Sequence, residues 1–316
     1  MHLLFLFFDG IGLGLDDPET NPFAAQALPT LTQFTADKKW LAGLPRIESD
    51  HASFIPTDAN LGVQGKPQSG TGQATIMTGI NVSQAIGRHY GPKPNPEIAE
   101  IVRRKSMITK LIRRGYSAGM LNAYPSRFLE GIASGQRLMS SNQLALHSAG
   151  VAMRDGAALI EGRALSADFT GEMWREHAAN FDAASTVWRT RPNTPDTPVF
   201  SADESGKLIA KLAMEQDFTF FDCWLTDYIG HRGTHEDAMR LLRIIDGVFA
   251  GLLESWDTAN DLILVTSDHG NLEALAERGH TRNLVPTLVI GERSHEFAAT
   301  ITDLTHIAPA ILRMFP

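Results

Sequence analysis

Three acidic residues directly follow apolar stretches of the kind that form buried strands, and histidines lie close to two of them. Asp9 follows LLFLFF, Asp227 follows FFDCWLT and Asp268 follows LILVTS; the accompanying histidines are His231, His269 and His280. Burying a carboxylate is costly unless its charge is paired or coordinates a metal ion. Carboxylate and imidazole ligands without thiolates suit zinc, manganese or magnesium. About six such ligands suit two metal ions with positions left open for a substrate.

Each of these residues has an ordinary structural explanation when it is considered alone. An aspartate after a strand is usually a helix cap or a turn former, and a single histidine is usually a satisfied surface or core residue. The prediction of a metal centre therefore depends on convergence, because all six side chains are expected at one edge of the same sheet.

A glycine-rich loop, PQSGTGQATIMTG at residues 67–79, leads into a predicted helix and carries the hydroxyls of Ser69 and Thr71. Backbone N–H groups and the positive end of a helix dipole favour phosphate at such a place. Metal coordination lowers the pKa of a serine hydroxyl enough for it to act as a nucleophile. The alternative is an ordinary Ser/Gly turn with a helix cap. Beside the metal ligands, we favour a nucleophile at Ser69 or Thr71.

The elements that must position these side chains alternate between short apolar strands and amphipathic helices. Strands are predicted over residues 2–8, 116–124, 218–227, 262–266 and 285–291, and helices over 95–115, 203–216, 235–256 and from about Leu304 to the C-terminus. This alternation predicts an α/β fold, a three-layer sandwich with a mostly parallel central sheet covered by helices on both faces. In such sheets the functional groups gather beyond the carboxyl ends of the strands.

Composition excludes several classes of protein. The chain has 316 residues, of which 43% are hydrophobic and 20% charged, as is typical of a globular protein. The net charge is −8 and no basic block stands out, so we expect no nucleic-acid partner. The single cysteine, Cys223, excludes an internal disulfide and a thiolate zinc site. No apolar run is long enough to cross a bilayer, and MHLLFLFFDGIG lacks the basic leader of a signal peptide, so we expect a cytoplasmic protein without a membrane partner.

We expect one domain over residues 1–316. Residues 126–200 are less regular than the rest, and RTRPNTPDTPVF at 189–200 is typical of a proline-rich surface stretch. The segment 126–200 is a candidate for a small lid or an irregular insertion within the domain. Nothing in the sequence indicates an oligomeric state.

Five pieces of the sequence resemble, in order, motifs of the alkaline phosphatase superfamily: FFDGIGLG, PQSGTGQ, TDYIGHRG, TSDHGNLE and GHTRNLVPTLVIG. They span residues 5–291, almost the whole chain. The resemblance points to the metalloenzyme branch that contains cofactor-independent phosphoglycerate mutase and phosphopentomutase. It implies an alkaline-phosphatase-like core.

Position by position, the resemblance implies two metal sites and a nucleophile. One site would consist of Asp227, His231 and His280, and the other of Asp9, Asp268 and His269, with Ser69 bridging in as metal ligand and nucleophile. Thr71 is then the reserve nucleophile, and Gln73 stands where the mutases carry a histidine. Both ligand sets accept manganese or zinc, with magnesium as a further option.

The resemblance also implies a reaction: in-line attack by Ser69 on phosphorus, a covalent phosphoserine, and transfer of the phosphoryl group to water or to a second hydroxyl. Arg88 and His89, in IGRHYGPKP, are predicted to bind a substrate anion, since arginine suits bidentate phosphate binding. The alternative is that Arg88 caps local carbonyl groups.

Two departures from the mutases favour hydrolysis. A six-residue link from Gly91 to Pro96 takes the place of their large inserted cap domain, and the lysine that they carry after the following strand is missing from AYPSRF. Without that cap, water should take the phosphoryl group. We therefore predict a two-metal phosphomonoesterase acting on a small phosphorylated metabolite. The alternatives are a phosphomutase whose lid comes from residues 126–200 or from a partner chain, a phosphodiesterase, and an inactive metal-stabilised binding protein.

Overall fold

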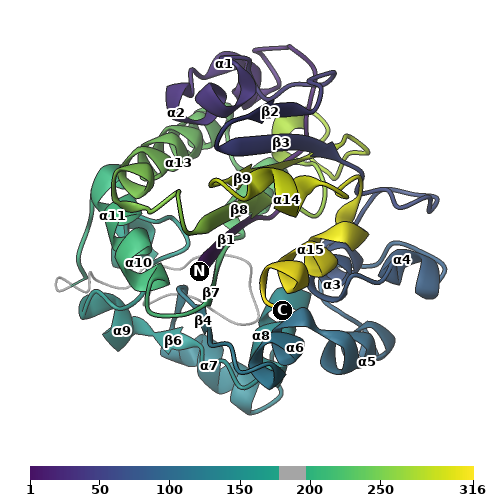
Figure 1. The fold of residues 1–316 in the computed structure, drawn as a ribbon, viewed down its shortest axis with the longest axis vertical. Helices are drawn as coiled ribbons and strands as arrows, with labels where there is room; N and C mark the ends of the chain where they lie inside the picture. The colour runs from purple at the N-terminus through teal and green to yellow at the C-terminus, as the bar shows by residue number, and fades with distance from the viewer. Residues whose placement is uncertain (178–196) are drawn as a thin grey trace.

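Seven strands form the central sheet of the chain, which the computed structural model describes over residues 1–177 and 197–316. From edge to edge they are β2 (Ile47–Ser49), β3 (Ala52–Thr57), β9 (Val285–Ile290), β8 (Leu262–Thr266), β1 (Leu3–Phe8), β7 (Phe218–Cys223) and β4 (Ala118–Met120), as Figure 1 shows. Helices cover both faces of this sheet. The predicted α/β sandwich is therefore confirmed.

The sheet contains parallel and antiparallel pairs, whereas the sequence predicts a mostly parallel sheet. β8, β1, β7 and β4 run parallel to one another, whereas β9 is antiparallel to both β8 and β3, and β2 is antiparallel to β3. A parallel return needs a long crossover, usually a helix. The connection from β8 to β9 contains only the short 3₁₀ turn Leu272–Ala274, so β9 returns in the opposite direction.

Strand β1 shows how the two cores form. Leu3, Phe5 and Phe7 belong to one hydrophobic cluster, and the alternate residues of the strand belong to the other. Successive side chains of a strand point to opposite faces, so a central strand covered on both sides must be apolar throughout. The uninterrupted LLFLFF run therefore defines the middle of the sheet.

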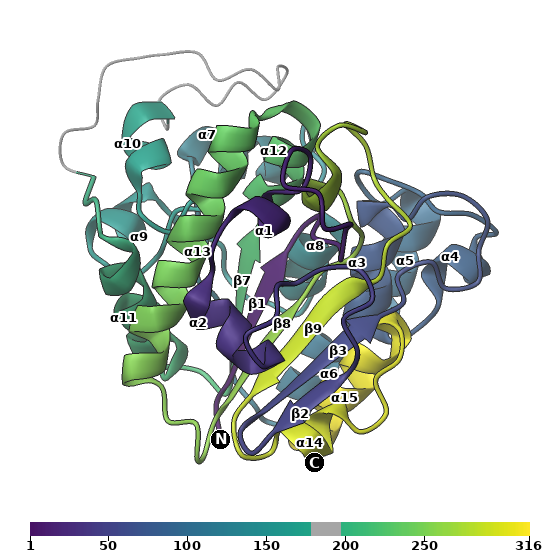
Figure 2. The same cartoon turned by 90° about the horizontal axis from the view of Figure 1, so that it is seen from above.

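Two sets of helices cover the two faces, as Figure 2 shows from above. One face carries α3 (Ser69–Thr78), α5 (Pro96–Lys105), α6 (Met107–Arg113), α8 (Ser141–Ser148) and α15 (Ile307–Met314). The other carries α1 (Pro22–Ala25), α2 (Pro29–Thr32), α11 (Ala202–Ala213) and α13 (His235–Ser255). Shorter helices are α4 (Val82–Ala85), α7 (Ser126–Ala133), α9 (Gly156–Ile160), α10 (Glu172–His177), α12 (Leu225–Arg232) and α14 (Ser294–Ala298).

The sequence predicts one continuous helix over residues 95–115, and this prediction is wrong. The structure has two helices there, α5 and α6, which are separated at Ser106. Ser106 has the extended ψ of 134°, and its hydroxyl accepts a hydrogen bond of 3.1 Å from the N–H of Ile108. A serine in this conformation ends one helix and caps the next. The amphipathic pattern continues across the break, which hides it in the sequence.

The strand predicted to run to Asp227 ends earlier, at Cys223. The chain turns at Trp224 into α12, so Asp227 lies in the first turn of a helix and not at the end of a strand. The hydroxyl of Thr226 donates a 2.9 Å hydrogen bond to the carbonyl of Cys223 and holds this turn. The apolar run in the sequence simply continues from the strand into the helix.

The segment 126–200, expected to be a lid or an irregular insertion, contains ordered elements of different kinds. Its helix α8 belongs to the layer that covers the sheet, and Ser141 donates a 2.7 Å hydrogen bond to the carbonyl of Gly70. β5 (Ala123–Tyr124) and β6 (Arg154–Asp155) pair as a small separate sheet beside α7 and α9. Residues 178–196, which include most of the proline-rich stretch, lie outside the described residues. The lid stays a prediction.

Within the described residues, no helix combines the length and the apolar character needed to cross a bilayer.

Candidate metal centre

The carboxyl ends of the parallel strands β1, β7 and β8 bring the predicted ligands to one edge of the sheet. Asp9 follows β1, Asp268 and His269 follow β8, and α12 after β7 carries Asp227. Two further ligand candidates come from α12 and from the β8–β9 connection: His231 and His280. The six side chains, which are far apart in sequence, meet at this edge as expected.

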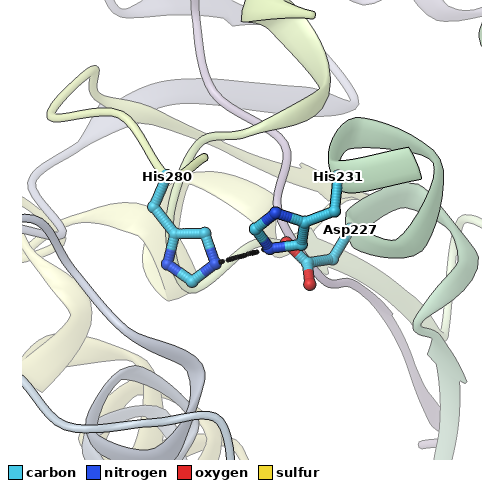
Figure 3. Close-up of side chains that lie close together, drawn as sticks. All are labelled: Asp227, His231 and His280. Atoms are coloured by element: carbon cyan, nitrogen blue, oxygen red, sulfur yellow. Dashed lines mark hydrogen bonds and ion pairs between the residues drawn. The ribbon is translucent and has the colours of Figure 1, made fainter. Parts of the chain in front are cut away.

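A first group consists of Asp227, His231 and His280. Each of them offers one ligand atom, and the three atoms lie within 4.8 Å of one another. The Nε2 atoms of His231 and His280 are 3.2 Å apart, and they lie 3.4 Å and 3.5 Å from Oδ1 of Asp227. Figure 3 shows Asp227 and His231 on α12 pointing toward His280 on the facing loop.

The hydrogen bonds behind this group show that it fits a cation. Nδ1 of His280 is 2.7 Å from the carbonyl oxygen of Pro67, and Nδ1 of His231 is 3.3 Å from that of Arg278. A carbonyl oxygen only accepts, so each Nδ1 carries a proton and each neutral Nε2 presents a lone pair. Two lone pairs 3.2 Å apart beside a carboxylate repel one another unless a cation lies between them. This tautomer is the one that metal-binding histidines adopt.

A second group consists of Asp9, Asp227 and His269, whose ligand atoms also lie within 4.8 Å of one another. Asp227 thus takes part in both groups, whereas the second predicted set contained Asp268. Nε2 of His269 lies 3.2 Å from Oδ1 of Asp9 and 3.6 Å from Oδ2 of Asp268. Oδ1 of Asp9 and Oδ2 of Asp268 are buried without a hydrogen bond. Buried carboxylate oxygens without a partner fit a bound cation.

The charges at this edge perturb one another strongly. Burial, and then the Asp9 carboxylate, raise the pKa of Asp268 well above its usual range. Burial opposes the protonation of His269, but the carboxylates of Asp268 and Asp9 outweigh it and raise its pKa to about 10. Burial also opposes ionisation of Asp227, yet without a metal the neighbouring imidazoles, His280 first once its Nε2 is protonated, hold the pKa of Asp227 below its usual range. The protein thus concentrates negative charge that a divalent cation would neutralise.

Ser69 lies at the start of α3 with its hydroxyl inside this cluster. Its Oγ is 2.9 Å from Nε2 of His269. The reserve candidate, Thr71, is fully buried, donates to the carbonyl of Gln68 at 3.2 Å and accepts from the N–H of Tyr90 at 3.2 Å. Thr71 therefore anchors a neighbouring loop, and Ser69 is the hydroxyl that faces the ligands. Gln73 donates a 3.0 Å hydrogen bond to Oδ2 of Asp9 and orients that carboxylate.

A cavity of 1040 Å³ opens beside the cluster. Its polar end contains Asp9, Ser69, Asp227, His231 and His280. Its other walls come from β5, α7, α10, α12 and the loops around them. A substrate bound in this cavity would therefore lie against both Ser69 and the metal ligands.

Arg88 and His89, predicted to bind a substrate anion, do not line the cavity. The guanidinium of Arg88 lies 5.6 Å from the ring centroid of Tyr90, and Nδ1 of His89 is 3.0 Å from the hydroxyl of Ser83. The geometry gives no support to a substrate contact by either residue.

Lys93 lines the cavity instead, although the sequence did not single it out. Its side chain is exposed where it lines the cavity. Desolvation by the surrounding walls lowers the pKa of Lys93, and the carboxylates of Asp222 and Asp9 oppose this shift. The loop that carries it packs on the first turn of α3: a Cβ on Gly70 would lie 2.6 Å from the carbonyl oxygen of Tyr90 and 3.2 Å from that of Lys93. The backbone of Lys93 therefore lies against the first turn of α3, and its ammonium group is close enough to Asp222 and Asp9 to interact with their charges.

Asp222 is the second cavity residue that the sequence did not single out. It is buried in β7, and Oδ1 has no hydrogen bond. Burial and the nearby Asp9 carboxylate raise the pKa of Asp222 to about 7, against the opposing charge of Lys93. A signal was present in the sequence, because Asp222 is the one charged residue inside the apolar run FTFFDCWL, and buried charges are rare without a function.

Comparison with known proteins agrees with this geometry. Residues 194–316 match the family model described as Metalloenzyme superfamily. The 2,3-bisphosphoglycerate-independent phosphoglycerate mutase of Thiobacillus denitrificans is 32% identical over 128 residues, which cover 38% of this chain and 24% of the relative. The protein of the same name from Francisella tularensis is 28% identical over 130 residues, covering 37% and 25%. The match thus spans about a quarter of the length of these curated relatives.

Solved structures share the fold over nearly the whole chain. PH0037 protein from Pyrococcus horikoshii aligns with a TM-score of 0.56 at 13% identity, covering 99% of this chain and 96% of that one. Alkaline phosphatase from the Antarctic bacterium TAB5 aligns with a TM-score of 0.52 at 15% identity, covering 99% and 97%. The metalloenzyme match over residues 194–316 and the fold shared with an alkaline phosphatase support the resemblance to the alkaline phosphatase superfamily that the five motifs indicate.

Proposed function

We propose that the chain is a metal-dependent phosphoryl-transfer enzyme, and specifically a phosphomonoesterase with Ser69 as nucleophile. The observation that carries this proposal is the position of the Ser69 hydroxyl, 2.9 Å from His269 and inside a cluster whose two three-ligand groups share Asp227. A hydroxyl at a helix start, next to carboxylates that lack partners, has no evident packing function.

Two divalent cations are the cofactors that this cluster fits. One would be held by Asp227, His231 and His280, and the other by Asp9 and His269 with Asp268 beside them. Bound cations there would lower the pKa of the Ser69 hydroxyl and stabilise negative charge on the phosphoryl oxygens. Oxygen and imidazole donors are acceptable to manganese, zinc and magnesium.

The residues of the chain itself then have separate roles in the reaction. Ser69 Oγ forms a bond to phosphorus while the bond from phosphorus to the substrate alcohol breaks, which leaves a phosphoserine. The first backbone N–H groups of α3 and the Lys93 ammonium hold phosphoryl oxygens. Water then attacks phosphorus, releases inorganic phosphate and restores the Ser69 hydroxyl. Hydrolysis is supported by the short link from Gly91 into α5 at Pro96, which leaves no room for a large inserted domain there.

A phosphomutase is the second candidate, and one observation favours it. The cavity beside Ser69 is walled by elements from residues 123–174 and 222–232, so a dephosphorylated intermediate could be retained there without a large cap. Two of the most similar curated proteins are mutases by name. Isomerisation of a phosphorylated substrate without release of inorganic phosphate would identify this reaction.

The test is turnover by the chelator-stripped chain after reconstitution with zinc, manganese or magnesium. We expect inorganic phosphate release from p-nitrophenyl phosphate only with metal. Ser69→Ala should lower kcat at least about 10³-fold while metal content, measured by mass spectrometry, is kept. Ser134→Ala, which removes an exposed serine of the 134–138 loop, is the matched control and should be fully active. No turnover with any metal, or near-normal turnover by Ser69→Ala, would contradict the proposal.

A further inference from the structure

We propose that Glu273 is a positioning residue of the metal centre, because its carboxylate holds together the chain segments that carry candidate ligands. These segments carry Asp9, His269 and His280. The inference rests on the proposed function, since it takes these side chains to bind metal ions. It also gives a role to residues of FFDGIGLG, TSDHGNLE and GHTRNLVPTLVIG that are not themselves candidate ligands.

Both carboxylate oxygens of Glu273 accept two hydrogen bonds each. Oε2 accepts from the backbone N–H of Gly12 at 2.9 Å and from that of Asn271 at 2.8 Å. Oε1 accepts from the hydroxyl of Thr281 at 2.5 Å and from the side-chain amide of Asn283 at 2.9 Å. Glu273 is only 2% exposed, so its charge is tolerated because protein donors satisfy both oxygens.

Three of the four donors stand within three residues of a candidate ligand, each on a different segment. The pairs are Gly12 after Asp9, Asn271 after His269, and Thr281 after His280. The bond to Gly12 joins residues 261 positions apart in the sequence, so Glu273 does more than cap its own 3₁₀ turn. Its carboxylate connects the segment after β1 with both ends of the connection between β8 and β9.

A further link runs from Glu273 through Asn271 to Asp227. Asn271 donates its backbone N–H to Glu273 and its side-chain amide to Oδ1 of Asp227 at 2.7 Å. Helix α12 packs closely on this amide, since an added Cβ on Gly230 would lie 2.6 Å from Cγ of Asn271. Because Asp227 belongs to both groups of candidate ligands, a displaced Asn271 would disturb both metal positions.

Glycines of two motifs leave room for the Glu273 side chain. An added Cβ on Gly12 or Gly270 would overlap with Oε1 of Glu273, and one on Gly14 would lie 2.7 Å from its Cγ. The segments after β1 and β8 can therefore approach this carboxylate only because these positions lack side chains. The close packing allows the carboxylate one position, so any change in Glu273 is passed to the ligand segments.

The experiment titrates Co²⁺ into the chelator-stripped full chain and follows the affinity and the visible absorption bands, which depend on the geometry of the bound ion. Glu273→Met keeps the length of the side chain and removes both acceptors. We expect it to bind Co²⁺ at least about tenfold more weakly, with shifted bands. Glu273→Gln keeps one acceptor for the N–H groups of Gly12 and Asn271, so its affinity should recover to within about threefold of the unchanged chain.

Thr281→Val tests the same role by a smaller change, should Glu273→Met fail to fold. It removes one donor directly beside His280, so it should weaken the binding of one Co²⁺ several-fold and leave the other unchanged. Asp246→Ala is the matched control. Asp246 is a buried carboxylate that accepts a 2.9 Å hydrogen bond from the N–H of Leu31 and does not line the cavity. Its loss should leave the Co²⁺ affinity within about twofold, whatever the Tm of the metal-free variant.

Normal Co²⁺ affinity with unshifted bands in both Glu273→Met and Thr281→Val would overturn the positioning role, and so would an equal loss of affinity in Asp246→Ala. Neither result depends on turnover. Release of phosphate from p-nitrophenyl phosphate is measured separately. If the unchanged chain binds Co²⁺ and the Glu273 variants weaken that binding, but no metal supports phosphate release, the proposed function is refuted and the positioning role stands.

Discussion

At the scale of single residues, Asp227 is the central candidate ligand, because it belongs to both groups of three side chains that could hold a metal ion. Asn271 donates a 2.7 Å hydrogen bond to Oδ1 of Asp227 and holds the carboxylate in place. The carboxylate lies one helical turn before His231, which brings both ligands to the same face of α12. One short helix thus supplies part of each group.

Asp222 gives a prediction for stability against pH. Its pKa of about 7 in the folded chain exceeds its ordinary value of 3.8, so between about pH 4 and pH 7 the folded state binds more protons than the unfolded state. The free energy of unfolding must then fall as pH rises through this window. In the chelator-treated chain, Asp222→Asn should raise this free energy by roughly 2–4 kcal/mol at pH 8 and leave it unchanged below pH 4.

Urea unfolding at pH 4, 6 and 8 measures this effect. Asp16→Asn, at an exposed position, is the matched control and should show no pH-dependent gain. An Asp222→Asn chain whose stability runs parallel to that of the unchanged chain across this range would show that Asp222 is not buried as an uncompensated acid.

Candidate site residues that directly follow strands are easier to predict from the sequence than those that lie in longer loops. Asp9, Asp268 and His269 could be placed because each follows an apolar strand, and parallel strands share an edge. Lys93 could not be placed, because nothing in GPKP indicates that its loop folds back onto α3. Arg88 was chosen for its chemistry alone; its guanidinium lies over the Tyr90 ring, and it does not line the cavity.

At the scale of elements, the loop of residues 90–93 brings the Lys93 ammonium group to the cavity. This loop is the beginning of the short link that leads into α5. It packs closely on α3, where Thr71 donates its N–H to the carbonyl of Tyr90 at 2.9 Å and Gly70 leaves no room for a side chain. The glycine is needed for close approach, since an added Cβ would lie 2.6 Å from a backbone oxygen.

We therefore expect Gly70→Ala to lower kcat/KM by displacing this loop, and Lys93→Gln to lower it about 10²-fold by removing the charge. Because both changes act through the same ammonium group, the double variant should lose less than the product of the two factors. Lys110→Gln, on the outer side of α6, is the control and should keep full activity. Multiplicative losses in the double variant would contradict this coupling.

Element boundaries were predictable only where the apolar pattern changes. The break at Ser106 and the turn at Trp224 interrupt elements without interrupting the pattern, so the sequence extends a helix and a strand beyond their true ends. The hairpin of β2 and β3 was missed because β2 has only three residues and β3 contains Pro56, which is unusual inside a strand.

At the scale of the whole molecule, the metal centre joins segments from both ends of the chain. Its candidate ligands follow β1 near the N-terminus and β8 near the C-terminus, and three carboxylates meet there with the imidazoles. Bound cations should thus stabilise the entire fold. At a free metal concentration about 100 times Kd, the gain is about 2.7 kcal/mol per site.

Chelation should accordingly lower Tm by about 5–10 °C, and zinc or manganese should restore it. Scanning calorimetry measures the shift, and the control is the same chelator saturated beforehand with metal. His231→Ala should bind about one ion fewer per chain and show a smaller shift. An unchanged Tm after complete removal of metal would show that the cluster does not bind cations in the folded state.

Both outermost strands of the sheet, β2 and β4, are only three residues long. An edge strand offers unpaired backbone groups to which another chain can add, and very short edges with charged residues reduce this risk. In β2, Glu48 pairs with Arg46 at 2.6 Å, which puts charge on the outer border. The phenylalanine-rich strands in the middle are thereby kept away from neighbouring molecules, and this chain should resist sheet-to-sheet aggregation although its central strands are almost wholly apolar.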